Sequence, residues 1–231
     1  GLVAHALGIH RAMAWGVDTI CSSVISQMHA AASLIAAGQA DHVLCVVSAA
    51  YSRVTDPGSS STIQEADMAG AMVVARRPGC RMDFAWRVDG RLHGAIRLAW
   101  DVPTGTAPRA WWQQSREKLL IRFDPELQTR VMGEIAKHAR TVCDEALARA
   151  EMRLDDIQVF LSHQPFVWYR EFIADLLGLR DDIVFDTFEE YGNVNSASIA
   201  TALHHARKAG RLEKGTQALV CSSTRRRRAS G

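Results

Sequence analysis

The sequence has few of the residues that keep a chain disordered or carry it into a membrane. Gly 16 and Pro 6 among 231 residues exclude a collagen-like or low-complexity chain. No apolar stretch approaches the roughly 18 residues of a membrane-spanning helix. The first residues carry neither a basic region nor an initiator Met, so no secretory signal is visible. We expect a globular chain of one large or two small domains, with a cytoplasmic location and no membrane partner.

An excess of one charge sign is also missing. The sequence has 27 Lys and Arg against 25 Asp and Glu, a net charge of +2. That balance excludes a general polyanion-binding role, and the six Trp do not alternate with a basic stripe, so we predict no nucleic-acid partner. The run of four arginines at 225–228 is interpreted as an altered terminus rather than a binding patch.

Paired cysteines and the common nucleotide, hydrolase and zinc motifs are absent from the sequence. The five cysteines include no Cys-x-x-Cys pair, which excludes a dense disulfide scaffold and a grouped zinc site. We predict reduced thiols and no metal. Four of the five are expected to behave as small core residues, with Cys45 inside an apolar run as the clearest example. Cys21 is the exception because of its position.

Hydrophobic periodicity predicts an alternation of strands and helices. The expected strands are 15–21, 42–48, 69–75, 82–88, 157–161, 183–185 and 217–222, and the expected helices are 22–37, 125–151, 166–177 and 196–209. The run 42–48 is hydrophobic on both faces, as in a covered parallel sheet. Residues 101–110, with two prolines and a glycine, form the best internal boundary. The pattern predicts an α/β architecture with mainly parallel sheets.

Cys21 stands where a predicted strand ends and a buried helix begins. The unpaired N–H groups and the positive end of the helix dipole there favour a thiolate, which can attack a carbonyl carbon. Position alone still leaves a buried structural cysteine as the more common alternative.

Two further residues follow predicted strands or precede helices. His163 comes directly after the strand 157–161, at the edge where open α/β sheets place their sites. Asn193 lies in the polar loop that enters the last helix, where a turn residue or helix cap is the ordinary alternative.

Taken together, the three segments resemble the ketoacyl-ACP synthase III branch of the thiolase superfamily. That family has a nucleophilic Cys at a buried helix start, then a His-Gln motif, then a Gly-Asn-x-x-x-Ala-Ser motif. Cys21 follows Asp18-Thr19-Ile20, His163 precedes Gln164, and Asn193 stands in Gly192-Asn193-Val194-Asn195-Ser196-Ala197-Ser198. The order agrees, and so do the separations of 142 and 30 residues. The resemblance covers about residues 5–223.

The resemblance implies a two-step thioester reaction. Cys21 would take an acyl group from acyl-CoA or an acyl carrier protein. His163 and Asn193 would then hydrogen-bond the thioester carbonyl of a malonyl unit and stabilise the enolate formed on loss of carbon dioxide. No cofactor is implied beyond the acyl-CoA or acyl carrier protein substrate, and the expected assembly is a homodimer.

The resemblance also implies a thiolase-like, layered αβαβα fold of two pseudo-repeated halves. Residues 1–107 would be the remainder of the N-terminal half with the nucleophilic Cys, and residues 108–231 the C-terminal half with His and Asn. Only 20 residues precede Cys21, so we expect the first half to be truncated at its start.

Two departures from the family pattern bear on function. The family's glycine-rich turn after the last strand, which supplies an oxyanion-hole N–H, is replaced here by the arginine run. A basic residue that helps hold the CoA phosphates is replaced by Trp168, expected to pack on the sheet, and Arg170 could substitute for it.

Three functions remain as alternatives to the decarboxylative condensation. An acyltransferase on the same scaffold would use His163 as a general base toward an alcohol or amine. A non-catalytic partner subunit would shape a tunnel for an active synthase. A biosynthetic thiolase would need a second catalytic Cys, for which Cys221 is a poor candidate because it lies in a predicted strand.

Overall fold

A computed structural model describes residues 1–100 and 118–223. The described part of the N-terminal region contains two helices and a pair of strands, and two further strands, which precede and follow residues 101–117 in the sequence, form a second pair. Their bounds are α1 (Leu2–Ala6), α2 (Ser23–Ala36), β1 (His42–Ala49), β2 (Met68–Ala75), β3 (Ile96–Trp100) and β4 (Leu119–Phe123). Both pairs are antiparallel, with His42 opposite Ala75 in the first and Ile96 opposite Phe123 in the second.

The C-terminal region alternates helices with short parallel strands. Its elements are α3 (Pro125–Ala150), β5 (Val159–Ser162), α4 (Tyr169–Leu177), β6 (Val184–Phe185), α5 (Phe188–Tyr191), α6 (Ser198–Lys208) and β7 (Ala218–Cys221). The strands pair in the order β6-β5-β7, and all four residues of β5 are buried. This is the covered parallel sheet that a continuous apolar run predicts.

Local signals explain where the helices begin and end. Pro125 opens α3, and the Asp124 carboxylate accepts a hydrogen bond from the Leu127 N–H at 3.0 Å, as a helix N-cap does. Helix α4 ends at Gly178, whose φ of +66° is the left-handed conformation that favours glycine.

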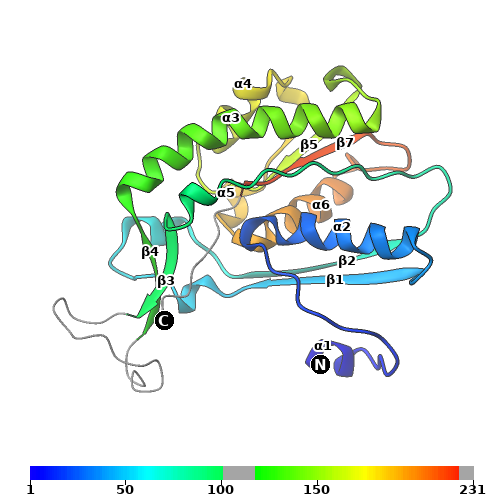
Figure 1. The fold of residues 1–231 in the computed structure, drawn as a ribbon, viewed down its shortest axis with the longest axis horizontal. Coiled ribbons are helices and arrows are strands. Elements are labelled where there is room, and N and C mark those ends of the chain that lie inside the picture. Colours follow the sequence, from blue (N-terminus) through cyan, green and yellow to red (C-terminus); the bar gives the residue numbers. More distant parts are fainter. Residues whose placement is uncertain (101–117, 224–231) are drawn as a thin grey trace.

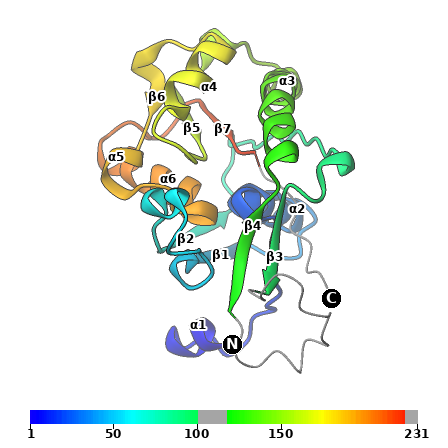
Figure 2. The same ribbon diagram turned by 90° about the vertical axis from the view of Figure 1, so that its left-hand side faces the viewer.

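The elements stack in layers, seen in Figure 1. Helices α3 and α4 cover one side of the β6-β5-β7 sheet, and α6 and α2 lie between that sheet and the β1–β2 pair. Figure 2 shows the same stack turned by 90°, with α3 and α4 at the top and α1 beyond β1. The order α, β, α, β reproduces four of the five layers that the family resemblance implies.

Besides a cluster between β5 and α6 and one between α2 and the β1–β2 pair, two hydrophobic clusters join the layers. One fills the space between the parallel sheet and the helices α3 and α4, around Phe160, Tyr169 and Ile173. The other joins α2, β1 and α6 through Val24, Val47 and Ile199. Because the second cluster contains residues at the start of α2 and of α6, it fixes the relative position of the segments that carry Cys21 and Asn193.

Three expectations about the strands and cysteines are wrong. Residues 15–21 and 82–88 are not strands: they find no partner strand within the described ranges, and Ile20 to Ser22 forms a 3₁₀ turn. Strand β1 is antiparallel to β2, and Leu44 and Val46 on its outer face are exposed, because alternate side chains of a strand point to opposite faces. Among the cysteines, Cys45 is buried as predicted, whereas Cys80 is exposed.

The expected domain boundary, between residues 107 and 108, lies outside the described residues.

Candidate active site

Cys21 lies in the 3₁₀ turn η1 (Ile20–Ser22), directly before α2, and is half-buried. The preceding residue, Ile20, has a φ of +57°, which is unfavourable for a β-branched side chain. The Asp18 carboxylate holds this conformation by accepting from the Ile20 N–H at 2.8 Å and from the Ser23 hydroxyl at 3.1 Å. The thiol is thus presented by a strained turn at a helix N-terminus, where strain of this kind often accompanies function.

The carboxyl end of β7 is hydrogen-bonded to this turn. The Ser222 hydroxyl donates to the Cys21 carbonyl oxygen at 3.0 Å, and the Ser22 hydroxyl donates to Ser222 Oγ at 3.2 Å. Residues about 200 positions apart in the chain therefore share one hydrogen-bonded group beside the predicted nucleophile.

His163 follows β5 and is almost completely buried, with 3% of its surface exposed. Its backbone N–H donates to the Cys221 carbonyl at 3.0 Å, and its Nδ1 lies 3.1 Å from Ser198 Oγ at the start of α6. Burial lowers the pKa of the imidazole to about 4, so the ring is neutral near pH 7. When Ser198 donates to Nδ1, the remaining proton is on Nε2, which is then a hydrogen-bond donor.

Asn193 is also buried, between α5 and the 3₁₀ turn η8 (Asn195–Ala197). Its backbone is fixed on both sides: its N–H donates to the Gln64 carbonyl at 2.7 Å, and its carbonyl accepts from the Ala66 N–H at 3.0 Å. Its side-chain Oδ1 accepts from the Asn195 N–H at 3.0 Å. The acceptor end of the amide is therefore occupied, and the Nδ2 end remains the donor.

The structure brings the segments of the three predicted residues together. The turn η1 with Cys21 lies against η8, which follows Asn193. His163 is joined to the same region through Ser198, the first residue after η8, and through Cys221, the neighbour of Ser222. Their catalytic roles stay predictions. Three further polar residues of this region carried no signal that sequence reasoning used: Glu65, Asn195 and Ser222. Ser198 entered that reasoning only as the last residue of the Gly-Asn-x-x-x-Ala-Ser motif.

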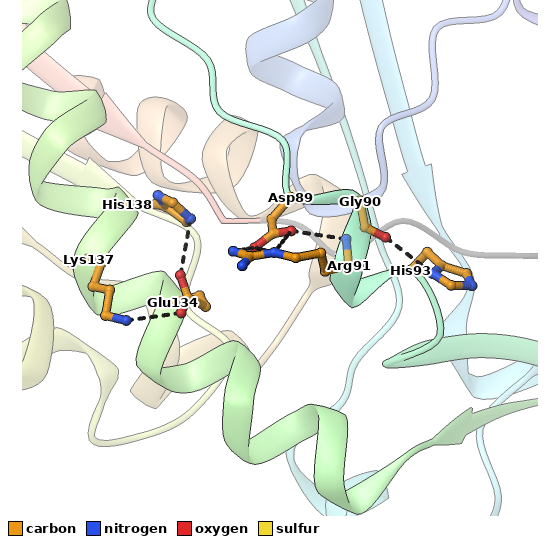
Figure 3. A network of polar contacts seen from close by, with 7 residues as sticks. All are labelled: Asp89, Gly90, Arg91, His93, Glu134, Lys137 and His138. Carbon is orange, nitrogen blue, oxygen red and sulfur yellow. Dashed lines mark hydrogen bonds and ion pairs between the residues drawn. The ribbon is translucent and has the colours of Figure 1, made fainter.

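One cluster with metal-ligand chemistry lies elsewhere, where the turn after residue 88 meets α3 (Figure 3). Oxygen and nitrogen atoms of Asp89, Glu134 and His138 lie within 4.8 Å of one another. Each carboxylate already faces a cation, since Arg91 contacts Asp89 at 2.6 Å and Lys137 contacts Glu134 at 3.0 Å. Arg91 also holds the pKa of Asp89 at about 2. Each ion pair joins residues of one element, Asp89 with Arg91 in the turn and Glu134 with Lys137 and His138 in α3.

The segment after His163 differs from the expectation for Trp168 and Arg170. Trp168 does not pack on the sheet: it is 45% exposed and stacks on Phe166, with ring centroids 5.1 Å apart. The Arg170 guanidinium is paired with the Asp181 carboxylate at 2.7 Å. A phosphate at Arg170 would have to compete with that carboxylate.

The layers and the site at the ends of β5 and β7 define a thiolase-like α/β protein, and solved structures share this fold. A beta-ketoacyl-[acyl carrier protein] synthase III from Thermus thermophilus superposes with a TM-score of 0.81 at 27% identity, over 96% of this chain and 67% of that one. The priming beta-ketosynthase of the R1128 polyketide pathway superposes with a TM-score of 0.82 at 25% identity, over 95% and 64%.

Sequence comparison narrows the class to one family. Residues 16–90 match 3-oxoacyl-[acyl-carrier-protein] synthase III, and residues 147–224 match the C-terminal part of the same family. The chain belongs to the 3-oxoacyl-[acyl-carrier-protein] synthase III family.

Among the described residues, no helix is both long enough and apolar enough to cross a membrane.

Curated relatives agree with this placement. The beta-ketoacyl-[acyl-carrier-protein] synthase III of Nitratidesulfovibrio vulgaris is 29% identical over 224 residues, covering 95% of this chain and 67% of the relative. A Streptomyces coelicolor synthase III is 30% identical over 228 residues, covering 94% and 65%. The chain thus spans about two thirds of the length of these relatives.

Proposed function

We propose that this chain carries the catalytic residues of an acyl-thioester condensing enzyme. The Cys21 thiolate attacks the carbonyl of an acyl-CoA or acyl carrier protein thioester, and the donor leaves as its thiolate and takes up a proton. A malonyl thioester then loses carbon dioxide, and the electron pair of the broken C–C bond forms an enolate. The enolate carbon attacks the acyl-Cys21 carbonyl, which releases a 3-oxoacyl thioester and returns the Cys21 thiolate.

The observation that carries this proposal is the buried, neutral state of His163. Decarboxylation needs hydrogen-bond donors at the thioester carbonyl, where negative charge develops, and it needs no proton acceptor. A neutral imidazole and the Nδ2 of Asn193 are both donors.

The same observation weighs against the acyltransferase alternative. An effective general base has a pKa near the working pH, and burial keeps the pKa of His163 at about 4. Acceptance of a proton from an alcohol or amine would leave an imidazolium in a site that disfavours charge. The homodimer, the absence of a cofactor and the cytoplasmic location stay predictions.

The test is covalent loading followed by condensation. The intact protein is incubated with short-, medium- and long-chain acyl-CoAs and its mass is measured. We expect an acyl adduct that disappears in Cys21→Ala and persists in Cys80→Ala, because Cys80 is an exposed cysteine distant in sequence from the site. Malonyl carrier protein is then added, and carbon dioxide and the 3-oxoacyl product are measured.

Each result separates the functions. Carbon dioxide release with a 3-oxoacyl product supports condensation. A Cys21 adduct that passes to an alcohol or amine without carbon dioxide supports the acyltransferase. If no donor gives an adduct, the condensing and the acyltransferase functions are both excluded, and the non-catalytic subunit remains.

A further inference from the structure

Glu65 brings a carboxylate to the Asn193 loop from a distant part of the chain. It follows the 3₁₀ turn η3 (Ser60–Gln64) and precedes β2, and its two oxygens face two different asparagines. Asn195 Nδ2 donates to Oε2 at 2.6 Å, and Asn193 Nδ2 lies 3.5 Å from Oε1. The carboxylate therefore bridges the side chains on either side of Val194.

The backbone of Glu65 is fixed against the same loop. Glu65 and Asn193 form a parallel bridge, made by the hydrogen bonds of Asn193 with Gln64 and Ala66. Glycine at position 192 allows the two segments to come this close, because a Cβ on this residue would lie 2.7 Å from the Gln64 carbonyl oxygen. The position of the carboxylate relative to Asn193 is thus set by main-chain contacts and not by a flexible surface loop.

These contacts define which end of the Asn193 amide is the donor. The Asn195 N–H occupies Oδ1, and the Glu65 carboxylate faces Nδ2. If the amide were flipped, Oδ1 would face the Glu65 carboxylate, which is also an acceptor. Nδ2 would face the Asn195 N–H, which is also a donor. An amide nitrogen carries two N–H groups, and one of them remains for a second acceptor.

Stability alone does not call for a carboxylate at this position. Burial raises the pKa of Glu65 because the ionised form is partly removed from water, and the hydrogen bond from Asn195 offsets this only in part. A glutamine would have the same shape without that penalty. It has a single acceptor oxygen, however, so it can serve one asparagine amide and must turn its own NH₂ toward the other.

We propose that Glu65 is a positioning residue for decarboxylation: its carboxylate fixes the Asn193 amide with Nδ2 as the donor toward the malonyl thioester carbonyl. This inference rests on the proposed condensing function. Glu65 does not touch the substrate in this scheme, and loading of Cys21 does not depend on it.

The experiment compares the two half-reactions in four proteins: wild type, Glu65→Gln, Asn193→Ala and the double variant. The matched control is Glu189→Gln, which makes the same chemical change at an exposed position on α5, four residues before Asn193. Acyl transfer from acyl-CoA to Cys21 is followed by intact mass. Decarboxylation of malonyl carrier protein is followed by carbon dioxide release, with kcat and KM determined separately.

We expect Glu65→Gln to lower the kcat of decarboxylation roughly tenfold or more, because a displaced donor stabilises the enolate poorly. KM and the rate of Cys21 acylation should stay within about twofold of wild type, and Glu189→Gln should resemble wild type in all respects. In the Asn193→Ala background, Glu65→Gln should cause no further loss, since a residue that acts through Asn193 has nothing left to position.

Other results overturn the inference. An equal fall of acylation and decarboxylation, or a further loss in the Asn193→Ala background, would give Glu65 a general structural role. An unchanged rate of decarboxylation in Glu65→Gln would show that Glu65 does not position Asn193. A faster rate would show that its charge opposes formation of the enolate. If wild type itself releases no carbon dioxide, the proposed condensing function fails and the inference with it, which distinguishes this case from a failure at Glu65 alone.

Discussion

The turn that carries Cys21 and the group around His163 and Asn193 are built in opposite ways. The Cys21 turn is held mainly by its own neighbours, since Asp18 and Ser23 supply the hydrogen bonds around the strained Ile20. Asp18 is exposed, and Cys21 is half-buried. His163 and Asn193 are buried, and their partners Ser198 and Glu65 lie 35 and 128 residues away.

This difference matches what the two steps of the proposed reaction require. A nucleophile must be reached by a bulky thioester, so local bonds in an accessible turn suffice. Oxyanion donors must be fixed before charge develops, in surroundings with little water, which buried long-range contacts provide. The first region should therefore lose little folding stability when one of its hydrogen bonds is removed, whereas displacement of the second region should cost much more.

The largest effect should come from Gly192→Ala, which disturbs the long-range region at its tightest point. Gly192 has φ +66° and ψ −157°, a conformation almost confined to glycine, and a Cβ would lie 2.7 Å from the Gln64 carbonyl oxygen. We expect a loss of about 3 kcal/mol in the free energy of unfolding, measured in urea, from strain and overpacking together.

The matched control is Gly210→Ala. Gly210 also has a positive φ, +71°, but a Cβ there would have nothing within 4 Å. Its loss should be about 1 kcal/mol, the conformational part alone. Equal losses in the two variants would mean that the contact between Gly192 and Gln64 does not limit the position of the Asn193 loop.

The second effect is a pH dependence of stability that His163 contributes. The ordinary imidazole pKa of 6.5 applies to the unfolded chain, and the buried ring has a pKa of about 4. Between these values the unfolded state binds more protons, so the contribution is complete above pH 6.5 and is lost as the pH falls toward 4. A shift of this size corresponds to about 3 kcal/mol.

The measurement is urea unfolding from pH 7.5 to pH 4 for wild type and for His163→Gln, whose side chain does not titrate. The wild type should lose more stability than the variant over this interval. Parallel pH profiles would show that His163 is not desolvated. Because the ring remains neutral, decarboxylation should also show no ionisation of His163 near pH 6.5.

The contrast between the two regions also decides what the sequence could predict. The start of α2 after Asp18 and Cys21 is a local signal, because a polar residue and a change of hydrophobic period lie within a few positions of each other. The buried run of β5 and the position of His163 after it follow from the same kind of pattern. The family resemblance then joined Cys21, His163 and Asn193 by their order and spacing.

Contacts between distant segments could not be predicted in this way. Nothing near Glu65 in the sequence indicates that its carboxylate meets Asn195, because the parallel bridge that joins them is formed only when η3 and the Asn193 loop pack together. Strand β1 illustrates the same limit. Its apolar run predicted burial on both faces, whereas antiparallel pairing with β2 leaves Leu44 and Val46 exposed.

The smallest effect should come from Asp18→Ala, which tests the local region. The substitution removes the acceptor of the Ile20 N–H, whereas the buried Ser23 hydroxyl keeps the Ile20 carbonyl as an acceptor at 2.6 Å. We expect a loss of about 1 kcal/mol in the free energy of unfolding, typical of a lost cap, with Asp41→Ala, another exposed aspartate, as the control.

Function should separate the two regions more clearly than stability does. Relaxation of the left-handed Ile20 in Asp18→Ala would move the Cys21 thiol, so acylation by acyl-CoA should slow by roughly tenfold. Decarboxylation of malonyl carrier protein should change little, because its proposed donors are held by Ser198 and Glu65. An equal slowing of both steps would mean that the hydrogen bonds of Ser222 to the Cys21 turn couple the two regions, and that the local and long-range parts of the site act as a single unit.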